Sequence, residues 1–272
     1  MKLLFLISSC SGRLQDIYNV VKDSEVFEDI LLLADGDEDE DTIIYSKDKR
    51  IIRVPVSDEY DKRVEQIVHA YHFIHDSEEH KDYTHIVQLQ DKDSRIQHLK
   101  DFRDLLMKQP EFEDEKEYYL GERILTKINP TFHLKVVKPE SPWHGKPYIG
   151  ETTIYADSGI SFLVLRRKAL DHIYAYTHPL NKEFISRTYI YGDLMIAIIL
   201  RKYDIHPKRI KNNLRDVDMK RLLKEKIQED TEETNKQKEI NKKKSEDAEK
   251  EYEEKQRLQN EARKNQSAVK GK

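Results

Sequence analysis

Short, uninterrupted apolar runs separated by amphipathic stretches constrain the fold of this chain more than any other feature. The runs at Leu3–Ser8 and Ile30–Leu33 are too short for ordinary helices and lack the alternation of a half-exposed strand, so we interpret them as strands buried on both faces. Between such runs, residues 64–74 carry apolar side chains at helical spacing. Strand and helix patterns therefore alternate, which predicts an α/β domain with a mostly parallel, Rossmann-like sheet flanked by helices.

Two carboxylates follow the third buried run, which spans Ile86–Leu89. Asp91 and Asp93 are one residue apart, so they can point to the same side just beyond the end of the strand. Ligands of open α/β sheets bind beyond the carboxyl ends of the strands. Because Mg²⁺ and Mn²⁺ prefer carboxylate oxygens, with substrate phosphates completing the shell, this pair predicts a metal and diphosphate site. Other Asp-x-Asp pairs, such as Asp35 with Asp37, fall in acidic loops and are interpreted as solvated.

The composition divides the chain of 272 residues into a body and a tail. We predict a domain over residues 1–215 and a charged, low-complexity tail over 216–272, because beyond Gln228 isolated apolar residues interrupt a run of charged and amide side chains. These apolar residues do not keep a heptad, so the expected tail is a solvated helix or disordered, and its expected role is tethering to a protein partner. The net charge of −4 argues against nucleic acid as a general partner.

Cys10 is the sole cysteine, which excludes an intramolecular disulfide and is compatible with a reducing compartment. The apolar run at Leu3–Ile7 is shorter than the core of a signal peptide, and no window approaches the length of a membrane span. The sequence therefore predicts a soluble, cytoplasmic chain without a transmembrane segment.

Four blocks between residues 47 and 207 carry a resemblance to a known family. The body resembles the beta-1,3-galactosyltransferase and Fringe-like glycosyltransferases, and the blocks occur in the family's order. They are Asp58-Glu59-Tyr60-Asp61 with Arg63 and Gln66, the strand and acidic motif of Ile86–Ile96, the run Tyr155–Leu170, and Tyr191-Gly192-Asp193-Leu194-Met195 with the following Leu200–Pro207.

The resemblance implies a GT-A fold and the transfer of a hexose-type sugar from a UDP-sugar to a hydroxyl of a glycan or glycoprotein acceptor, with Mn²⁺ or Mg²⁺ as cofactor. It implies that Asp93 holds the metal, with Asp91 near the donor, and that Asp193 is the base of an inverting reaction that gives a beta linkage. Gly192 stands where the family has glutamate, and Asp61 where it has asparagine. The family's cysteines and membrane anchor are missing, so we expect a divergent, soluble viral or microbial relative.

Further residues complete the predicted site. Trp143 and His144 lie in a proline-rich loop and are candidates for acceptor binding, although Trp143 can equally belong to the core. His206 is a candidate third metal ligand. Donor contacts are predicted for Ser8, Ser9 and Arg13 after the first strand, for Asp58 and Arg63, for Asp91, and for Asp157, Ser158 and Gly159.

Two other classes of protein remain open from the sequence. A metal-dependent nucleotidyltransferase also uses an acidic pair, but its substrate is attacked at phosphorus and it needs no acceptor sugar pocket. A non-catalytic scaffold or binding protein would leave the acidic pairs solvated and would use the charged tail to recruit partners.

Overall fold

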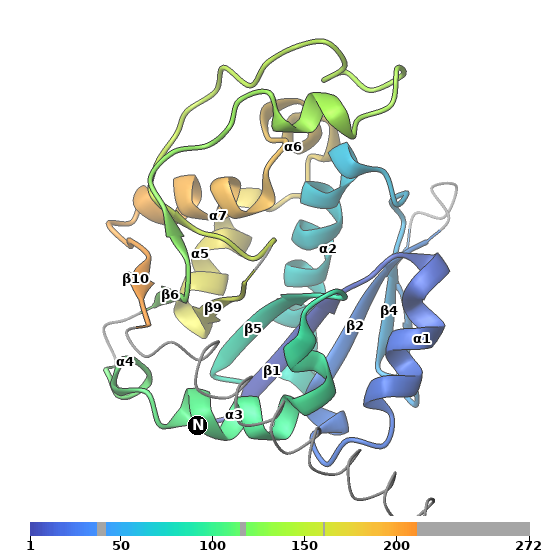
Figure 1. The fold of residues 1–272 in the computed structure, drawn as a ribbon, viewed down its shortest axis with the longest axis vertical. Helices are drawn as coiled ribbons and strands as arrows, with labels where there is room; N and C mark the ends of the chain where they lie inside the picture. Colours follow the sequence, from blue (N-terminus) through green and yellow to red (C-terminus); the bar gives the residue numbers. More distant parts are fainter. Residues whose placement is uncertain (37–41, 115–117, 160, 211–272) are drawn as a thin grey trace, which may run out of the picture. The chain divides into compact units, whose positions relative to one another are not determined.

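The computed structural model describes residues 1–36, 42–114, 118–159 and 161–210. Its main feature is a mixed, mostly parallel eight-stranded sheet in the order β10-β6-β9-β5-β1-β2-β4-β3 (Figure 1). Its strands are β1 (Leu3–Ser8), β2 (Ile30–Asp35), β3 (Ile44–Ser46), β4 (Ile51–Val54), β5 (His85–Gln90), β6 (Tyr119–Gly121), β9 (Leu163–Arg166) and β10 (Lys208–Arg209).

The central strands are parallel, and two strands run against them. β1 pairs in parallel with both β2 and β5, and β2 pairs in parallel with β4. β9 is antiparallel to its neighbours β5 and β6, and β3 is antiparallel to β4 at one edge. β7 (Ile124–Leu125) and β8 (Tyr155–Ala156) form a separate two-stranded antiparallel sheet. The α/β, mostly parallel prediction is confirmed.

Helices cover both faces of the sheet because β1 alternates its apolar side chains between them. Leu4 and Leu6 pack in the cluster that contains the apolar faces of α2, α5 and α7, whereas Phe5 and Ile7 pack in the cluster that contains those of α1 and α3. The helices are α1 (Ser11–Val21), α2 (Arg63–Asp76), α3 (Leu99–Met107), α4 (Pro110–Glu113), α5 (Arg167–Thr177), α6 (Lys182–Thr188) and α7 (Gly192–Arg201).

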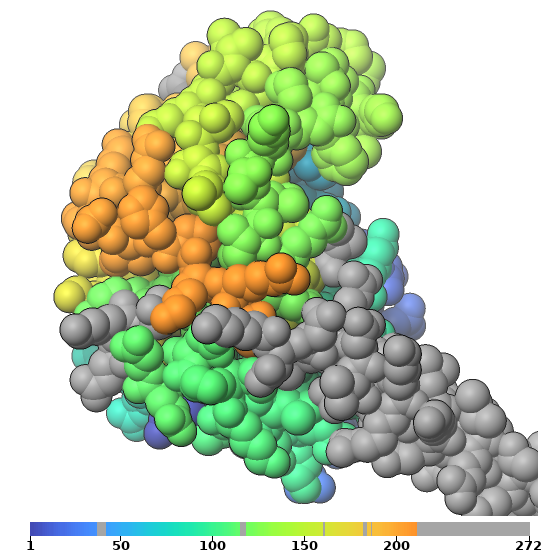
Figure 2. Space-filling model, turned by 60° about the vertical axis from the view of Figure 1, so that its left-hand side comes forward, coloured from blue at the N-terminus to red at the C-terminus, as the bar shows by residue number. Residues whose placement is uncertain are grey.

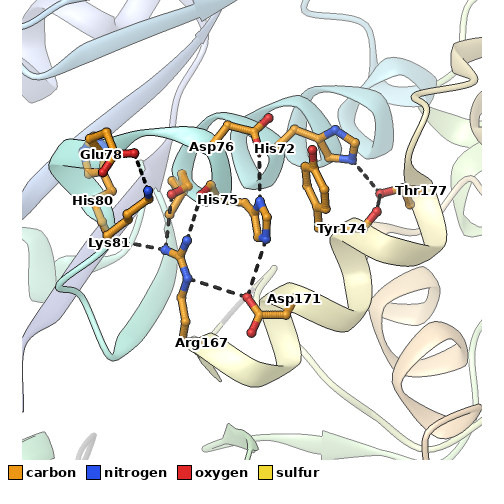
Figure 3. A network of polar contacts seen from close by, with 11 residues as sticks. His72, His75, Asp76, Glu78, His80, Lys81, Arg167, Asp171, Tyr174 and Thr177 are labelled. Atoms are coloured by element: carbon orange, nitrogen blue, oxygen red, sulfur yellow. Dashed lines mark hydrogen bonds and ion pairs between the residues drawn. The ribbon is translucent and has the colours of Figure 1, made fainter.

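A polar network joins the C-terminal half of α2 to α5 (Figure 3). The guanidinium group of Arg167 donates hydrogen bonds to the backbone oxygens of Ile74 and His75 in the last turn of α2 and of His80 in the turn that follows it. The ring of His75 stacks on Tyr174 with 3.7 Å between centroids. These contacts fix α5, and with it the adjoining strand β9, against α2.

The observed elements agree with the sequence pattern where the pattern is long. The three apolar runs predicted as buried strands are β1, β2 and β5, and the predicted helical spacing over residues 64–74 lies within α2. The predicted tail, residues 216–272, lies outside the described residues. No helix within the described part of the chain is long and apolar enough to cross a membrane.

Candidate functional site

The acidic pair lies at the edge of the sheet where β1, β2, β5 and β6 end. The backbone N–H of Asp91 donates to the carbonyl of Ser8 at 2.9 Å, which extends the β1/β5 ladder to this edge. The side chains of Asp91 and Asp93 are 12% and 7% exposed. Both carboxylates are therefore held at a defined place just beyond the carboxyl end of β5, as the sequence predicts.

Asp91 is held by residues that follow β1. Arg13, in the first turn of α1, places Nη1 3.0 Å from Oδ1, and the hydroxyl of Ser9 donates to Oδ2 at 3.2 Å. Within the described residues, the Oγ atom of Ser8 is buried and has no hydrogen-bond partner. Three residues predicted to contact a donor are thus gathered around Asp91, and one of them carries a free hydroxyl.

Asp93 belongs to a second ionic cluster. It accepts hydrogen bonds from the backbone N–H and from Nη1 of Arg95, at 2.9 and 2.7 Å. Arg95 also pairs with Glu122 at 2.5 Å, and the hydroxyl of Ser161 donates to the same Glu122 oxygen. The guanidinium group lies 5.0 Å from the centre of the Phe162 ring, so Arg95 is held on both its polar and its apolar sides.

Asp58 and Arg63 lie at the same edge of the sheet. Burial raises the pKa of Asp58, the negative charges of Asp35 and Asp91 raise it further, and the positive charge of Arg63 opposes them. Asp35 ends β2 and accepts a hydrogen bond from the backbone N–H of Ser11 at 2.6 Å. The ends of β1, β2 and β5 and the segment before α2 therefore bring acidic and basic side chains to one place.

The residues present can supply two carboxylates to a divalent metal. Within the described ranges, no group of three or more His, Cys, Asp or Glu side chains is arranged to hold a metal ion. Asp91 and Asp93 are hard oxygen ligands of the kind that Mg²⁺ and Mn²⁺ take, and Arg13 and Arg95 balance their charges without metal. This donor set fits an ion whose remaining ligands are water and the phosphates of a substrate.

Asp193 lies in the first turn of α7, and Ser158 holds its carboxylate. The backbone N–H and the hydroxyl of Ser158 donate to the two carboxylate oxygens at 2.8 and 2.5 Å. Ser158 Oγ accepts from Nε2 of Gln88 at 3.1 Å, and Gln88 Oε1 accepts from the hydroxyl of Tyr71 at 2.5 Å. A directed chain of hydrogen bonds thus runs from α2 through β5 to Asp193.

The pKa of Asp193 is raised to about 6. Burial of the carboxylate is the largest cause, the bonds from Ser158 oppose it, and the negative charge of Asp157 adds to it. A carboxylate with this pKa is suited to accept a proton near neutral pH. The carboxylate of Asp193, in the first turn of α7, accepts its hydrogen bonds from the 157–159 turn.

Asp157 and Gly159 form that turn. Oδ1 of Asp157 accepts from the backbone N–H of Gly159 at 2.9 Å, and Arg123 approaches Oδ2 at 3.4 Å. The turn presents the backbone of Ser158 to Asp193. Asp157, Ser158 and Gly159 are therefore brought together beside the predicted base.

Trp143 and His144 lie on a long segment that packs next to α7. Trp143 is half-buried, with its ring centroid 5.9 Å from that of His133 and 6.0 Å from that of Tyr148. His133 is hydrogen-bonded at 2.8 Å to the hydroxyl of Tyr191, two residues before Asp193. Trp143 thus packs in an aromatic cluster that borders the site, and His144 is exposed.

His206 is not brought to the acidic pair. It precedes β10, which runs parallel to β6, so it lies toward the opposite edge of the sheet from Asp91 and Asp93. It is exposed and pairs with Asp204 at 3.4 Å. The sequence could not reveal this, because the direction of β10 depends on its pairing with β6.

Four residues of the site were missed by the sequence reasoning. Asp35 is the last residue of β2 and Glu122 directly follows β6, so the signal that selected Asp91, an acid at the end of a buried strand, was available for both. The pairing of Arg95 with Glu122 and the polar contacts of Gln88 join segments far apart in the sequence. No local sequence pattern predicts those contacts.

Comparisons with known proteins do not assign a function to this site. No protein-family model matches the chain, and no curated protein matches it. Among solved structures, the chain is similar to a cytidylyltransferase from Leptospira borgpetersenii serovar Hardjo-bovis (strain JB197), with a TM-score of 0.36 and 12% identity over 79% of this chain and 78% of that one. A similarity this low carries no argument about function.

Proposed function

We propose that this chain is a metal-dependent glycosyltransferase that moves a hexose-type sugar from a UDP-sugar to a hydroxyl of a glycan acceptor with inversion. The observation that carries the proposal is Asp193, a carboxylate with a pKa of about 6 that is linked through Ser158 to Gln88 of β5, the strand that Asp91 and Asp93 follow. A transfer to a hydroxyl needs a base on the acceptor side and charge neutralisation on the donor side.

The donor side is supported by the groups around the ends of β1 and β5. Arg13 and Arg63 are the cations available for a diphosphate, and the unpaired hydroxyl of Ser8 is available for a donor oxygen. Asp91 and Asp93 would hold Mn²⁺ or Mg²⁺ together with the diphosphate. When bound, the metal would neutralise the charge that develops on the departing UDP.

The acceptor side is supported by the surroundings of Asp193. Tyr60 connects the two sides: the Arg63 guanidinium lies 5.6 Å from the centre of its ring, and the negative charge of Asp193 helps to raise the pKa of its hydroxyl. The aromatic cluster with Trp143 and Tyr148 borders the same place. Asp193 would accept the proton of the acceptor hydroxyl as that oxygen attacks the anomeric carbon.

Calorimetric titration of UDP with and without Mn²⁺ tests the donor side. We expect binding that requires the metal and weakens at least about tenfold in Asp93→Asn. Asp16→Asn is the matched control, because Asp16 is an exposed residue of α1, outside the site. Release of free sugar from a panel of UDP-sugars then tests the chemistry.

Each other outcome points to a different class. Binding of nucleoside triphosphates with release of pyrophosphate, and no turnover of UDP-sugars, would contradict the glycosyltransferase and favour a nucleotidyltransferase. A folded protein that binds no nucleotide under either condition would contradict both enzymes and favour the scaffold.

A further inference from the structure

Exposed apolar side chains gather on one segment of the described chain, residues 127–154. Phe132, Val136, Ile149 and Ile154 are all exposed, and Ile149 is 91% exposed. Isolated exposed apolar residues are ordinary, whereas a group of them on one surface is typical of an interaction site.

The 127–154 segment is also basic, although the chain is acidic. It carries four lysines against two glutamates, while the chain as a whole has a net charge of −4. The lysines, which are interspersed with the exposed apolar residues, are Lys127, Lys135, Lys138 and Lys146.

Polar contacts fix the segment to the body beside the candidate base. Ser141 donates to the buried carboxylate of Asp61 at 2.7 Å, and Lys138 pairs with Glu59 at 2.8 Å. The hydroxyl of Tyr191 donates to the backbone oxygen of Asn129 at 2.9 Å. In Figure 2 the segment, green to yellow-green, forms the upper part of the visible face. Its exposed apolar residues are thus carried on an anchored surface rather than on a free loop.

We propose that the 127–154 segment docks on the surface of an anionic lipid bilayer. Apolar side chains would enter the interface while Lys127, Lys135 and Lys146 contact lipid phosphates, which is the pairing by which peripheral proteins bind membranes. The segment forms one wall of the acceptor side, so docking would bring Asp193 to the bilayer surface. Resting on the proposed function, this implies an acceptor sugar carried by a lipid.

The charge pattern favours a bilayer over a second copy of this chain. Lysines spread among apolar residues would face one another across a symmetric contact, where like charges repel. The same lysines are complementary in charge to a surface of anionic headgroups. Self-association is therefore the outcome that would overturn the proposal.

Flotation of the full chain with vesicles tests the docking. We expect binding to phosphatidylcholine vesicles that contain phosphatidylglycerol, weaker binding to phosphatidylcholine alone, and at least about a tenfold loss in the double variant Val136→Asp/Ile149→Asp. The matched control is Val20→Asp/Met107→Asp, which places the same charges on exposed apolar positions of α1 and α3. Equal thermal unfolding midpoints would show that both variants fold.

The outcomes separate the docking from the proposed function. Equal vesicle binding by the wild type and the Val136/Ile149 variant would overturn the proposal, as would a wild type that does not bind. Light scattering that shows a dimer dissociated by the same variant would assign the segment to a second copy instead. UDP binding is measured in parallel. A Val136/Ile149 variant that loses vesicle binding but keeps its UDP affinity supports the docking. A wild type that binds vesicles but not UDP contradicts the proposed donor site and leaves the docking supported.

Discussion

At the residue scale, Asp193 combines burial, which raises its pKa to about 6, with two hydrogen bonds from Ser158 that fix the carboxylate. We predict that Asp193→Asn lowers sugar transfer by about 10²–10⁴-fold, because the amide cannot accept the proton of the acceptor. UDP affinity should remain, since Asp193 is not among the proposed donor contacts. Initial rates and calorimetry on the same preparation measure both, with Asp16→Asn as the control.

The pH profile of the wild type follows from the same carboxylate. The base must be ionised, so transfer should be full well above pH 6 and should fall as the pH drops through about 6. A rate that is unchanged between pH 7.5 and 5 would contradict the role of Asp193.

Ser158 affects the pH profile through the pKa of Asp193. Its hydroxyl and backbone N–H both lower the pKa of Asp193, and Ser158→Ala removes the hydroxyl but leaves the backbone bond. We therefore predict that the acid limb of the pH profile moves to higher pH. The loss of transfer should be larger at pH 6.5 than at pH 8. An equal loss at both pH values would instead indicate that Ser158 acts on the fold alone.

At the element scale, β6 and β8 approach so closely at Gly121 that a side chain has no room. A Cβ atom at this position would lie 2.5 Å from the Cβ of Ala156. We predict that Gly121→Ala lowers the free energy of unfolding by about 1–3 kcal/mol, because one of the two strands must shift. Chemical denaturation measures the loss.

Two variants control for this explanation. Gly12→Ala, in α1, meets no atom within 4 Å and should be neutral or stabilising. The double variant Gly121→Ala/Ala156→Gly moves the methyl group from one strand to the other and should recover most of the loss. Ala156 directly precedes the 157–159 turn, so Gly121→Ala should also lower transfer through Ser158.

The elements that could be predicted are those whose pattern is local. β1, β2 and β5 are continuous apolar runs, and α2 and α7 have helical periodicity, so their type and order follow from the sequence. The antiparallel direction of β9 and the edge strand β3 do not, because strand direction and pairing are set by contacts between distant segments. The same difference separates Asp91, which follows an apolar run, from the Arg95–Glu122 pair.

At the scale of the whole molecule, three histidines in contact with the core are neutral when the protein is folded. Burial lowers the pKa of His72, His80 and His85 to about 4, with help from Arg50 at His80 and from Arg166 at His85. His72 lies between α2 and α5, with Nε2 2.7 Å from the hydroxyl of Thr177 (Figure 3). An unfolded histidine has a pKa near 6.5.

The sign of the effect follows from these pKa values. Between pH 6.5 and 4 the unfolded chain binds more protons than the folded protein, so the stability that is complete above pH 6.5 is lost as the pH falls toward 4. Asp193 and Asp58 act in the opposite direction, because burial raises the pKa of each, but they are two groups against three. Acid should therefore destabilise the protein well before its ordinary carboxylates are protonated.

Replacing one of these histidines should flatten the dependence. We predict that lowering the pH from 7.5 to 5 costs His72→Gln about 1–2 kcal/mol less unfolding free energy than the wild type, because glutamine does not titrate while it can still donate to Thr177. His144→Gln changes an exposed histidine and should leave the wild-type dependence unchanged. Denaturant titrations at the two pH values measure the difference, and parallel losses in all three proteins would mean that groups other than the buried histidines govern acid stability.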